Sequence, residues 1–333
     1  MADITTITQG GLEASVDARG AQLRSLRLGG VEYLWQADER WWPRSAPILF
    51  PIVGKIRNGF ATCSAGECHM GRHGIARNYD HELIENTGSS LTYRFESTAE
   101  TREAYPYDFR LEMTYAIEGD TTLAQTFAVT NTGDVDLPFC LGGHPAFNVP
   151  LREGEAFEDY TLWFSRAWTG TSPTADDGIE NYGRMRTMID GTNRLPLTHD
   201  LFANDSFTLE GVPDSTISMV GPTGHGVRVD FEGFDHIGVW SAGPSAEGTP
   251  APFVALEHGA APRRARTRTT CSSTSRTSSS PCPARRCAVR LASRCCRRAR
   301  IAPVALAFAG AFLHARGRFG KQNRTINDEG RHP

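Results

Sequence analysis

The sequence predicts an all-β protein: a large antiparallel β-sandwich followed by a C-terminal tail of different character. Short stretches alternate apolar and polar residues, which is the period of a half-buried strand. Gly, Pro, Asn and Asp separate these stretches at short intervals, and no long stretch has a helical period. Many short strands divided by frequent turns are typical of a β-sandwich.

The alternation is clearest at residues 91–96, 109–115 and 123–129. The last two are joined by Glu118-Gly119-Asp120, which predicts a hairpin turn, and the Asn131-Thr132-Gly133-Asp134 stretch predicts the next turn.

Later strands are expected at residues 215–220, 226–231, 237–240 and 253–256. Two stretches, residues 41–57 and 165–198, lack a strand pattern. We expect them to be long irregular connections that cover one face of the sandwich and build a cleft.

The composition changes sharply after residue 259. Residues 1–259 hold all Trp and Tyr and carry 18 Lys and Arg against 36 Asp and Glu, whereas residues 260–333 carry 17 against 2. Five of the eight Cys also lie in the second part. We therefore divide the chain into a β-sandwich domain, residues 1–259, and a basic low-complexity tail without a fold, residues 260–333.

We interpret the tail as out-of-frame translation of a GC-rich gene, because such frames are rich in Arg, Ala, Pro, Ser and Cys. The codons GAR-CCA-TGG-G encode Glu-Pro-Trp, and deleting one C gives Glu-His-Gly, as found at residues 257–259. The alternative is a basic arm that binds nucleic acid or an anionic membrane. The absence of motif spacing and of any strand or helix period disfavours this alternative.

Composition also limits cofactors, partners and location. The N-terminus lacks a basic segment followed by an apolar one, so no secretory signal is expected. The apolar run at residues 301–313 is shorter than the roughly 20 residues of a membrane-spanning helix. The predicted domain has only three Cys, which suits reduced thiols in the cytoplasm. We expect no nucleic acid, no membrane and no cofactor.

Three short stretches carry residues suited to acid/base chemistry: 72–77 with His73, 142–148 with His144, and 253–257 with Glu257. An imidazole can donate a proton near neutral pH, and a carboxylate can accept one. Each residue also has an ordinary interpretation. Either histidine could simply be hydrogen-bonded in a turn, and Glu257 could be a surface charge at the end of a strand.

Other residues gave weaker indications. Arg44, Lys55, Arg57 and Arg77 could surround an anionic group, although isolated basic side chains are usually solvated. One of Trp35, Trp41 and Trp42 could be a flat platform for a sugar ring, although Trp is more often part of the core. Two histidines and a glutamate could ligate zinc, but Gly71 and Gly74 disfavour a helical His-x-x-x-His pair at His69 and His73, so no metal is expected.

Taken together, the motifs resemble the aldose 1-epimerase (mutarotase) superfamily, specifically its LacX-like branch. The resemblance covers about residues 10–257 and is carried, in the family's order, by residues 32–36, 48–54, 73–77, 105–107, 143–148, 201–205 and 253–257. The family fold is a large β-sandwich, sometimes called a supersandwich, which agrees with the strand pattern.

The resemblance implies an isomerase of carbohydrate metabolism that interconverts the α and β anomers of an aldose without metal or cofactor. It implies that Glu257 takes the proton from the anomeric hydroxyl, that His144 protonates the ring oxygen, and that His73 hydrogen-bonds the sugar. Arg77, Arg57 and Asp200 are the further substrate-binding candidates. Asp205 is a second candidate for the sugar-binding aspartate.

The sequence departs from the family where Pro-Trp would follow the base, because His258 and Gly259 stand there. Two alternatives to a free-sugar epimerase stay open. One is a hexose-6-phosphate mutarotase in which Arg57 and Arg77 hold the phosphate. The other is a non-catalytic carbohydrate-binding β-sandwich. The partner would be a sugar or a sugar phosphate, and the protein a monomer or homodimer.

Overall fold

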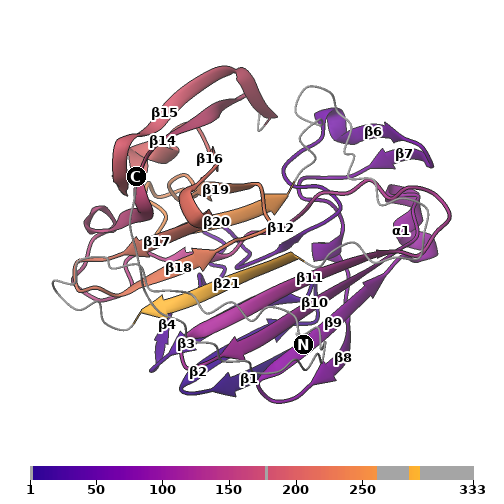
Figure 1. Cartoon of the computed structure of the whole chain (residues 1–333), viewed down its shortest axis with the longest axis horizontal. Coiled ribbons are helices and arrows are strands. Elements are labelled where there is room, and N and C mark those ends of the chain that lie inside the picture. The colour runs from indigo at the N-terminus through magenta and orange to yellow at the C-terminus, as the bar shows by residue number, and fades with distance from the viewer. Residues whose placement is uncertain (1–2, 177–178, 261–284, 293–333) are drawn as a thin grey trace, which may run out of the picture. The chain divides into compact units, whose positions relative to one another are not determined.

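The fold is almost entirely β, as the sequence predicts (Figure 1). The structure is a computed structural model that describes residues 3–176, 179–260 and 285–292. All of these belong to one compact unit that spans residues 1–296. No helix among them is long and apolar enough to cross a membrane.

The largest sheet has nine antiparallel strands in the order β15-β14-β17-β18-β21-β11-β10-β9-β8. Their bounds are β8 Glu82–Asn86, β9 Ser90–Glu96, β10 Phe109–Glu118, β11 Thr122–Asn131, β14 Thr161–Asp176, β15 Ile179–Pro196, β17 Thr216–Val220, β18 Gly226–Asp230 and β21 Arg285–Ala292. The strands predicted at residues 91–96, 109–115 and 123–129 are confirmed as parts of β9, β10 and β11. In β10, residues buried at every second position produce the predicted alternation.

A six-stranded sheet supplies two of the candidate catalytic residues. Its main order is β16-β19-β20-β12-β5, and β13 also pairs with β20. The bounds are β5 Ile48–Leu49, β12 Leu141–Gly143, β13 Ala146–Asn148, β16 Phe207–Glu210, β19 His236–Trp240 and β20 Phe253–Ala260. Glu257 lies within β20, and His144 follows β12, the next strand in the sheet.

The remaining elements are small. A four-stranded sheet is formed by β1 Ile4–Gln9, β2 Leu12–Asp17, β3 Gln22–Leu28 and β4 Val31–Glu32, and a separate hairpin by β6 Phe60–Cys63 and β7 Gly66–His69. The one described α-helix is α1 Ala99–Ala104. Thr98 is its N-cap residue, and the Thr98 side chain accepts a hydrogen bond from the backbone N–H of Thr101. Short 3-10 helices occur at η1 Arg57–Gly59, η2 Ala76–Asn78, η3 Phe157–Asp159, η4 His199–Phe202 and η5 Pro213–Ser215.

The prediction of an irregular connection at residues 165–198 is wrong. Most of this stretch lies in the long hairpin of β14 and β15. The two strands pair with four register shifts, at Trp163/Trp168, Trp168/Gly170, Gly170/Thr171 and Pro173/Thr174. Such bulges place extra residues in a strand and break the period of two, which hides the strand from a search for alternation.

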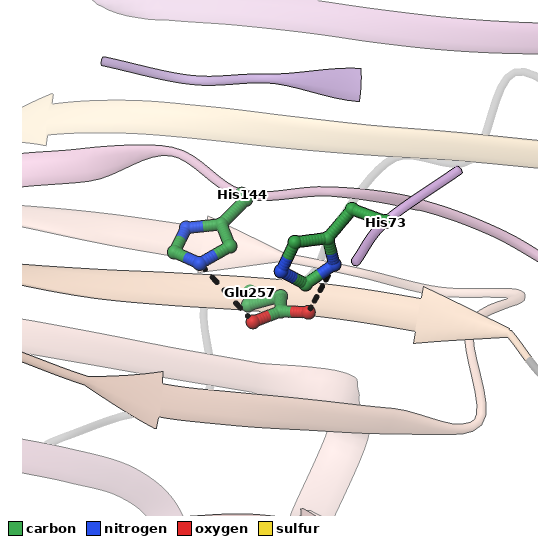
Figure 2. Close-up of side chains that lie close together, drawn as sticks. All are labelled: His73, His144 and Glu257. Carbon is green, nitrogen blue, oxygen red and sulfur yellow. Dashed lines mark ion pairs between the residues drawn. The ribbon is translucent and has the colours of Figure 1, made fainter. Parts of the chain in front are cut away.

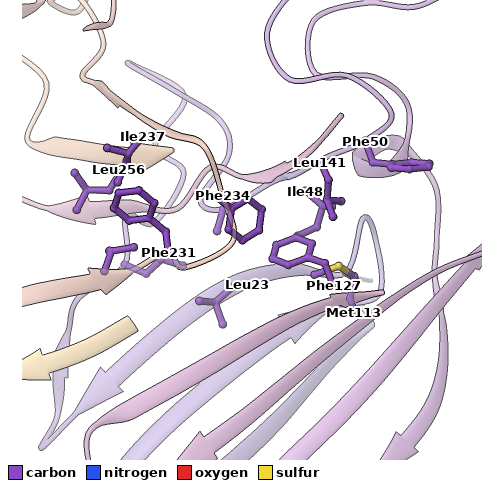
Figure 3. Close-up of a cluster of buried hydrophobic side chains, with 14 of the residues drawn as sticks. Leu23, Ile48, Phe50, Met113, Phe127, Leu141, Phe231, Phe234, Ile237 and Leu256 are labelled. Carbon is purple, nitrogen blue, oxygen red and sulfur yellow. The ribbon is translucent and has the colours of Figure 1, made fainter. Parts of the chain in front are cut away.

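The main hydrophobic core lies between the sheets. Figure 3 shows Met113 and Phe127 on the large sheet, Ile237 and Leu256 on the six-stranded sheet, and Phe234 between them. A smaller cluster contains Trp35, Phe253 and three small residues, with Trp41, Trp42 and Trp240 packed on it. This aromatic cluster borders the candidate site.

One strand, β21, lies within the predicted tail. It pairs on one side with β11, from Thr122↔Arg290 to Phe127↔Arg285, and on the other with β18. These eight residues, and Ala260 at the end of β20, are the described residues of the predicted tail, and they lie in sheets. The rest of the tail prediction lies outside the described residues, and the domain boundary at residue 259 stays a prediction.

Candidate active site

Three segments far apart in the sequence bring His73, His144 and Glu257 together (Figure 2). Nε2 of His144 lies 3.3 Å from Oε2 of Glu257, and Nδ1 of His73 lies 3.8 Å from Oε1 of the same carboxyl group. The two imidazole rings are nearly perpendicular, with centroids 5.4 Å apart. The trio predicted from the sequence thus shares one site.

The two glycines before His144 allow β12 to lie close to β20. A Cβ atom on Gly142 would be 2.5 Å from the carbonyl oxygen of His258, and one on Gly143 would be 2.8 Å from the His258 ring. Side chains at either position would push the strands apart and separate His144 from Glu257. Glycine at these positions lets one strand approach the other closely, because it has no Cβ atom.

Tryptophans pack around the ring of His144. Trp42 lies against it at 4.8 Å with a tilt of 31°, and Trp240 meets it edge-on at 5.5 Å. Burial lowers the pKa of His144 to about 3, because the imidazolium would lose its hydration. The Nδ1 atom of His144 is buried without a hydrogen-bond partner in the described part of the chain.

Glu257 is held by the middle of a sheet. Its strand pairs with β19 at Gly238, where a Cβ atom would lie 3.6 Å from Oε2 of the carboxyl group. Burial raises the pKa of Glu257 to about 8, and the negative charge of Glu180 acts in the same direction. Arg72 and Arg77 oppose this shift.

The two pKa shifts define a pair that holds one proton at neutral pH. With the pKa of His144 near 3 and that of Glu257 near 8, the resting proton lies on the glutamate. Moving it to Nε2 of His144 gives an imidazolium and a carboxylate with no change in total charge. The pair can therefore donate a proton at one end and accept one at the other.

A cavity of about 480 Å³ opens above the trio. Loops near the β6–β7 hairpin and residues of the β14–β15 hairpin both line it, and Figure 1 shows these hairpins on either side of the six-stranded sheet. Its volume lies within the range of small-molecule sites. Apolar side chains and many charged or polar ones line it together, which suits a sugar, whose ring has apolar faces and polar edges.

Two of the predicted basic residues line this cavity. Arg77 donates a hydrogen bond to the carbonyl of Arg72 at 2.6 Å, and burial lowers its pKa to about 10, so it stays charged at neutral pH. Arg57 lines the cavity from an exposed position in η1. Lys55 also lines it, whereas Arg44 donates to the carbonyl of Arg77 and does not reach the cavity.

The structure places the two candidate aspartates differently. Asp200 is exposed in η4 and does not line the cavity, so its predicted role in sugar binding is not supported. Asp205 does line it, and its carboxylate lies 3.9 Å from Arg72. The 3-10 helix η4 ends at Phe202, so Asp200 lies within it and points to solvent, whereas Asp205 follows it and lines the cavity.

The aromatic platform is also resolved. Trp42 lines the cavity, whereas Trp35 and Trp41 lie in the cluster behind it. Sequence reasoning missed further lining residues, which are Arg72, Glu180, Tyr182, His236 and Trp240. Arg72 adjoins His73 and could have been found, but Glu180 and Tyr182 lie on the hairpin that was expected to be irregular.

The same trio offers metal-ligand atoms. One nitrogen from each histidine and one oxygen of Glu257 lie within 4.8 Å of one another. Two imidazoles and a carboxylate are a donor set that zinc accepts. The expectation that no metal takes part therefore stays a prediction.

Comparisons with known proteins identify the family of this chain. The aldose 1-epimerase family matches residues 3–240 of the chain. The plasmid form of protein LacX from Lactococcus lactis subsp. lactis is 35% identical over 248 residues, which cover 72% of this chain and 81% of the relative. A maltose epimerase from Levilactobacillus brevis is 24% identical and covers 64% of this chain and 65% of that protein.

Solved structures show the same fold. A galactose mutarotase related enzyme from Lactobacillus acidophilus superposes with a TM-score of 0.79 at 26% identity, over 87% of this chain and 98% of the other. A galactose mutarotase-like protein from Lactobacillus casei gives 0.74 at 28% identity, over 87% and 100%.

Proposed function

Since this chain belongs to the aldose 1-epimerase family, we propose that it interconverts the α and β anomers of an aldose by acid/base opening and closure of the sugar ring. The observation that carries the proposal is the His144–Glu257 pair, 3.3 Å apart at the wall of a cavity that can take a sugar. Family membership supports an isomerase, and the roles of individual residues are our assignment.

The reaction uses the single proton of the pair. The carboxylate of Glu257 accepts the proton of the anomeric hydroxyl, and the imidazolium of His144 gives its proton to the ring oxygen. The bond between the anomeric carbon and the ring oxygen breaks, and the anomeric oxygen becomes an aldehyde. After the aldehyde rotates, the ring closes on its other face and both protons return.

Other lining residues would hold the sugar. His73 would hydrogen-bond the sugar near the ring oxygen. Arg77 can donate hydrogen bonds to sugar hydroxyl groups, and the carboxylate of Asp205 can accept them. Trp42 and Trp240 offer apolar surface to the face of the ring. No step in this scheme requires oxidation or reduction.

A second candidate is a hexose-6-phosphate mutarotase. It is favoured by Arg57, Arg72 and Arg77, which all line the cavity. Among the described residues Arg77 has no carboxylate within ion-pair distance, so an anionic group of a substrate could occupy that position. A cytoplasmic location and a monomeric or homodimeric state stay predictions of the sequence.

Polarimetry on freshly dissolved α-D-glucose, α-D-galactose, maltose and glucose 6-phosphate tests the proposal. The full chain should bring at least one of them to anomeric equilibrium faster than buffer does. Acceleration confined to the phosphorylated sugar would favour the second candidate. Sugar binding by saturation-transfer NMR without any acceleration would overturn both and indicate a carbohydrate-binding protein.

A further inference from the structure

The backbone around His73 is held in an unusual conformation. His73 has φ of 66°, in the left-handed region that non-glycine residues rarely adopt, and Gly74 follows with φ of 72°. A Cβ atom on Gly74 would lie 2.4 Å from the carbonyl oxygen of Phe50. The loop is therefore pressed against a neighbouring segment, and the imidazole has a fixed point of attachment.

Gly54 holds this loop through two hydrogen bonds. The backbone N–H of His73 donates to the carbonyl of Gly54 at 2.7 Å, and the backbone N–H of Gly54 donates to Nδ1 of His73 at 3.1 Å. A backbone N–H can only donate, so Nδ1 must present its lone pair. The proton of the neutral ring then lies on Nε2.

The surroundings keep this ring neutral. Burial lowers the pKa of His73 to about 2, and His144, Arg77, Arg72 and Arg44 act in the same direction. The nearby carboxyl of Glu257 does not form an ion pair with such a ring. Its Oε1 atom lies 3.8 Å from Nδ1 of His73, beyond hydrogen-bond distance, and the lone pair of Nδ1 already accepts from Gly54, so this contact is not a hydrogen bond.

The two histidines of the site consequently differ. In Figure 2 the Nε2 side of the His73 ring faces toward His144, above Glu257. No hydrogen bond to this nitrogen is formed within the described ranges of the chain. Nδ1 of His144, in contrast, has no hydrogen-bond partner among the described residues, and its Nε2 faces Glu257 at 3.3 Å.

We infer that Gly54 is a positioning residue: its backbone N–H fixes His73 as the neutral Nε2–H tautomer. His73 is then a permanent hydrogen-bond donor to the sugar and takes no part in proton transfer. This inference rests on the proposed function only for the identity of the acceptor. The tautomer itself can be measured without substrate or activity.

NMR of the full chain with isotope-labelled histidine is the direct test. The His73 nitrogens, identified by their loss in His73→Gln, should report a protonated Nε2 and an unprotonated Nδ1 throughout about pH 5 to 8, the interval in which an ordinary histidine titrates. Titration within that interval, or a proton on Nδ1, would overturn the inference. So would a shift of Nδ1 on adding zinc, because the metal would then have displaced Gly54.

A pH profile separates a donor from an acid or base. His73→Gln keeps an N–H donor and should lower kcat/KM by no more than about tenfold, the order of one hydrogen bond to substrate. Its pH profile should overlay that of the parent. His73→Leu has no donor and should lose more, with the profile again unmoved. If either variant shifts a limb of the profile, His73 titrates during the reaction and the inference is wrong.

Discussion

Glu257 and His258 are adjacent in β20 and point to opposite faces of the sheet, where their surroundings differ. Glu257 faces the cavity, where two imidazoles and two arginines surround its carboxyl group. His258 faces the core between Phe127 and Phe234, with ring centroids 5.8 and 4.7 Å away, and neither of its nitrogens has a partner in the described structure. Burial raises the pKa of Glu257 to about 8 and lowers that of His258 to about 3.

The difference shows when burial of a titratable group is useful. On the cavity face, the shifted pKa leaves Glu257 and His144 sharing a proton that a substrate can use. On the core face, the free energy that it costs to desolvate the His258 imidazole is not offset by a hydrogen bond to any described residue. His258 is also the first residue after the expected frame change, which stays a prediction.

The largest effect should come from breaking the cavity face. Glu257→Gln removes the proton acceptor and should slow anomerisation on the order of 10²-fold or more, the usual size of one acid/base contribution. Polarimetry measures the rate, and circular dichroism should show an unchanged fold. Glu247→Gln, at an exposed glutamate, is the matched control and should match the parent. If Glu257→Gln is as active as this control, Glu257 is not the proton acceptor of the reaction.

A substitution on the core face, at His258, should change the free energy of unfolding and leave the rate of anomerisation unchanged. His258→Leu removes an imidazole that has no hydrogen-bond partner among the described residues, and it should raise the free energy of unfolding by about 1–3 kcal/mol in urea denaturation at neutral pH. The gain should grow in acid. The unfolded histidine binds a proton below its ordinary pKa of 6.5, while the folded one does not until about pH 3, so the parent loses stability as pH falls between these values.

His69→Leu is the control for this variant, because His69 is exposed on β7. It should leave the free energy of unfolding at neutral pH nearly unchanged. Destabilisation by His258→Leu would mean that the imidazole has a partner outside the described residues, and the contrast between the two faces would fail.

A smaller effect is expected at the rim of the cavity. Asp205→Asn should raise KM for the sugar by about tenfold, since a charged hydrogen bond to the ligand is weakened. Asp200→Asn should leave KM unchanged, because that aspartate does not reach the cavity. Steady-state polarimetry measures KM for both variants. A larger rise in KM for Asp200→Asn than for Asp205→Asn would show that Asp200, the aspartate chosen from the sequence, binds the sugar.

The subtlest effect concerns pH. Because the pair must hold one proton, kcat/KM should stay level through neutral pH and fall as pH rises through about 8, where the proton leaves Glu257. A free histidine acid would instead lose activity near its ordinary pKa of 6.5. A profile that falls near the latter value would show that the two groups titrate independently.

Sequence reasoning succeeded where the physical signal is local. Strands such as β10 bury every second residue, so their period is visible in the chain. The trio of His73, His144 and Glu257 was predicted because each lies within a distinctive short motif. The β14–β15 hairpin was missed because its bulges break the period, and Glu180 was missed with it.

Other features depend on distances that no local pattern contains. Asp200 and Asp205 are both plausible in sequence, and only the path of η4 decides which one faces the cavity. The hydrogen bond from Gly54 to His73 joins two loops and depends on backbone direction. Pairing of β21 with β11 and β18 was likewise not predicted, because the composition of residues 260–333 led us to expect no fold there.

The position of β21 has a consequence for the order in which the chain folds. β11 and β18 are neighbours of β21 on its two sides, yet both precede it in the sequence. During synthesis the nine-stranded sheet cannot become continuous until residue 292 has left the ribosome, and pairing between strands so far apart in the sequence is slow. Until then β11 and β18 each present an unpaired edge, and such edges are open to strands of another chain.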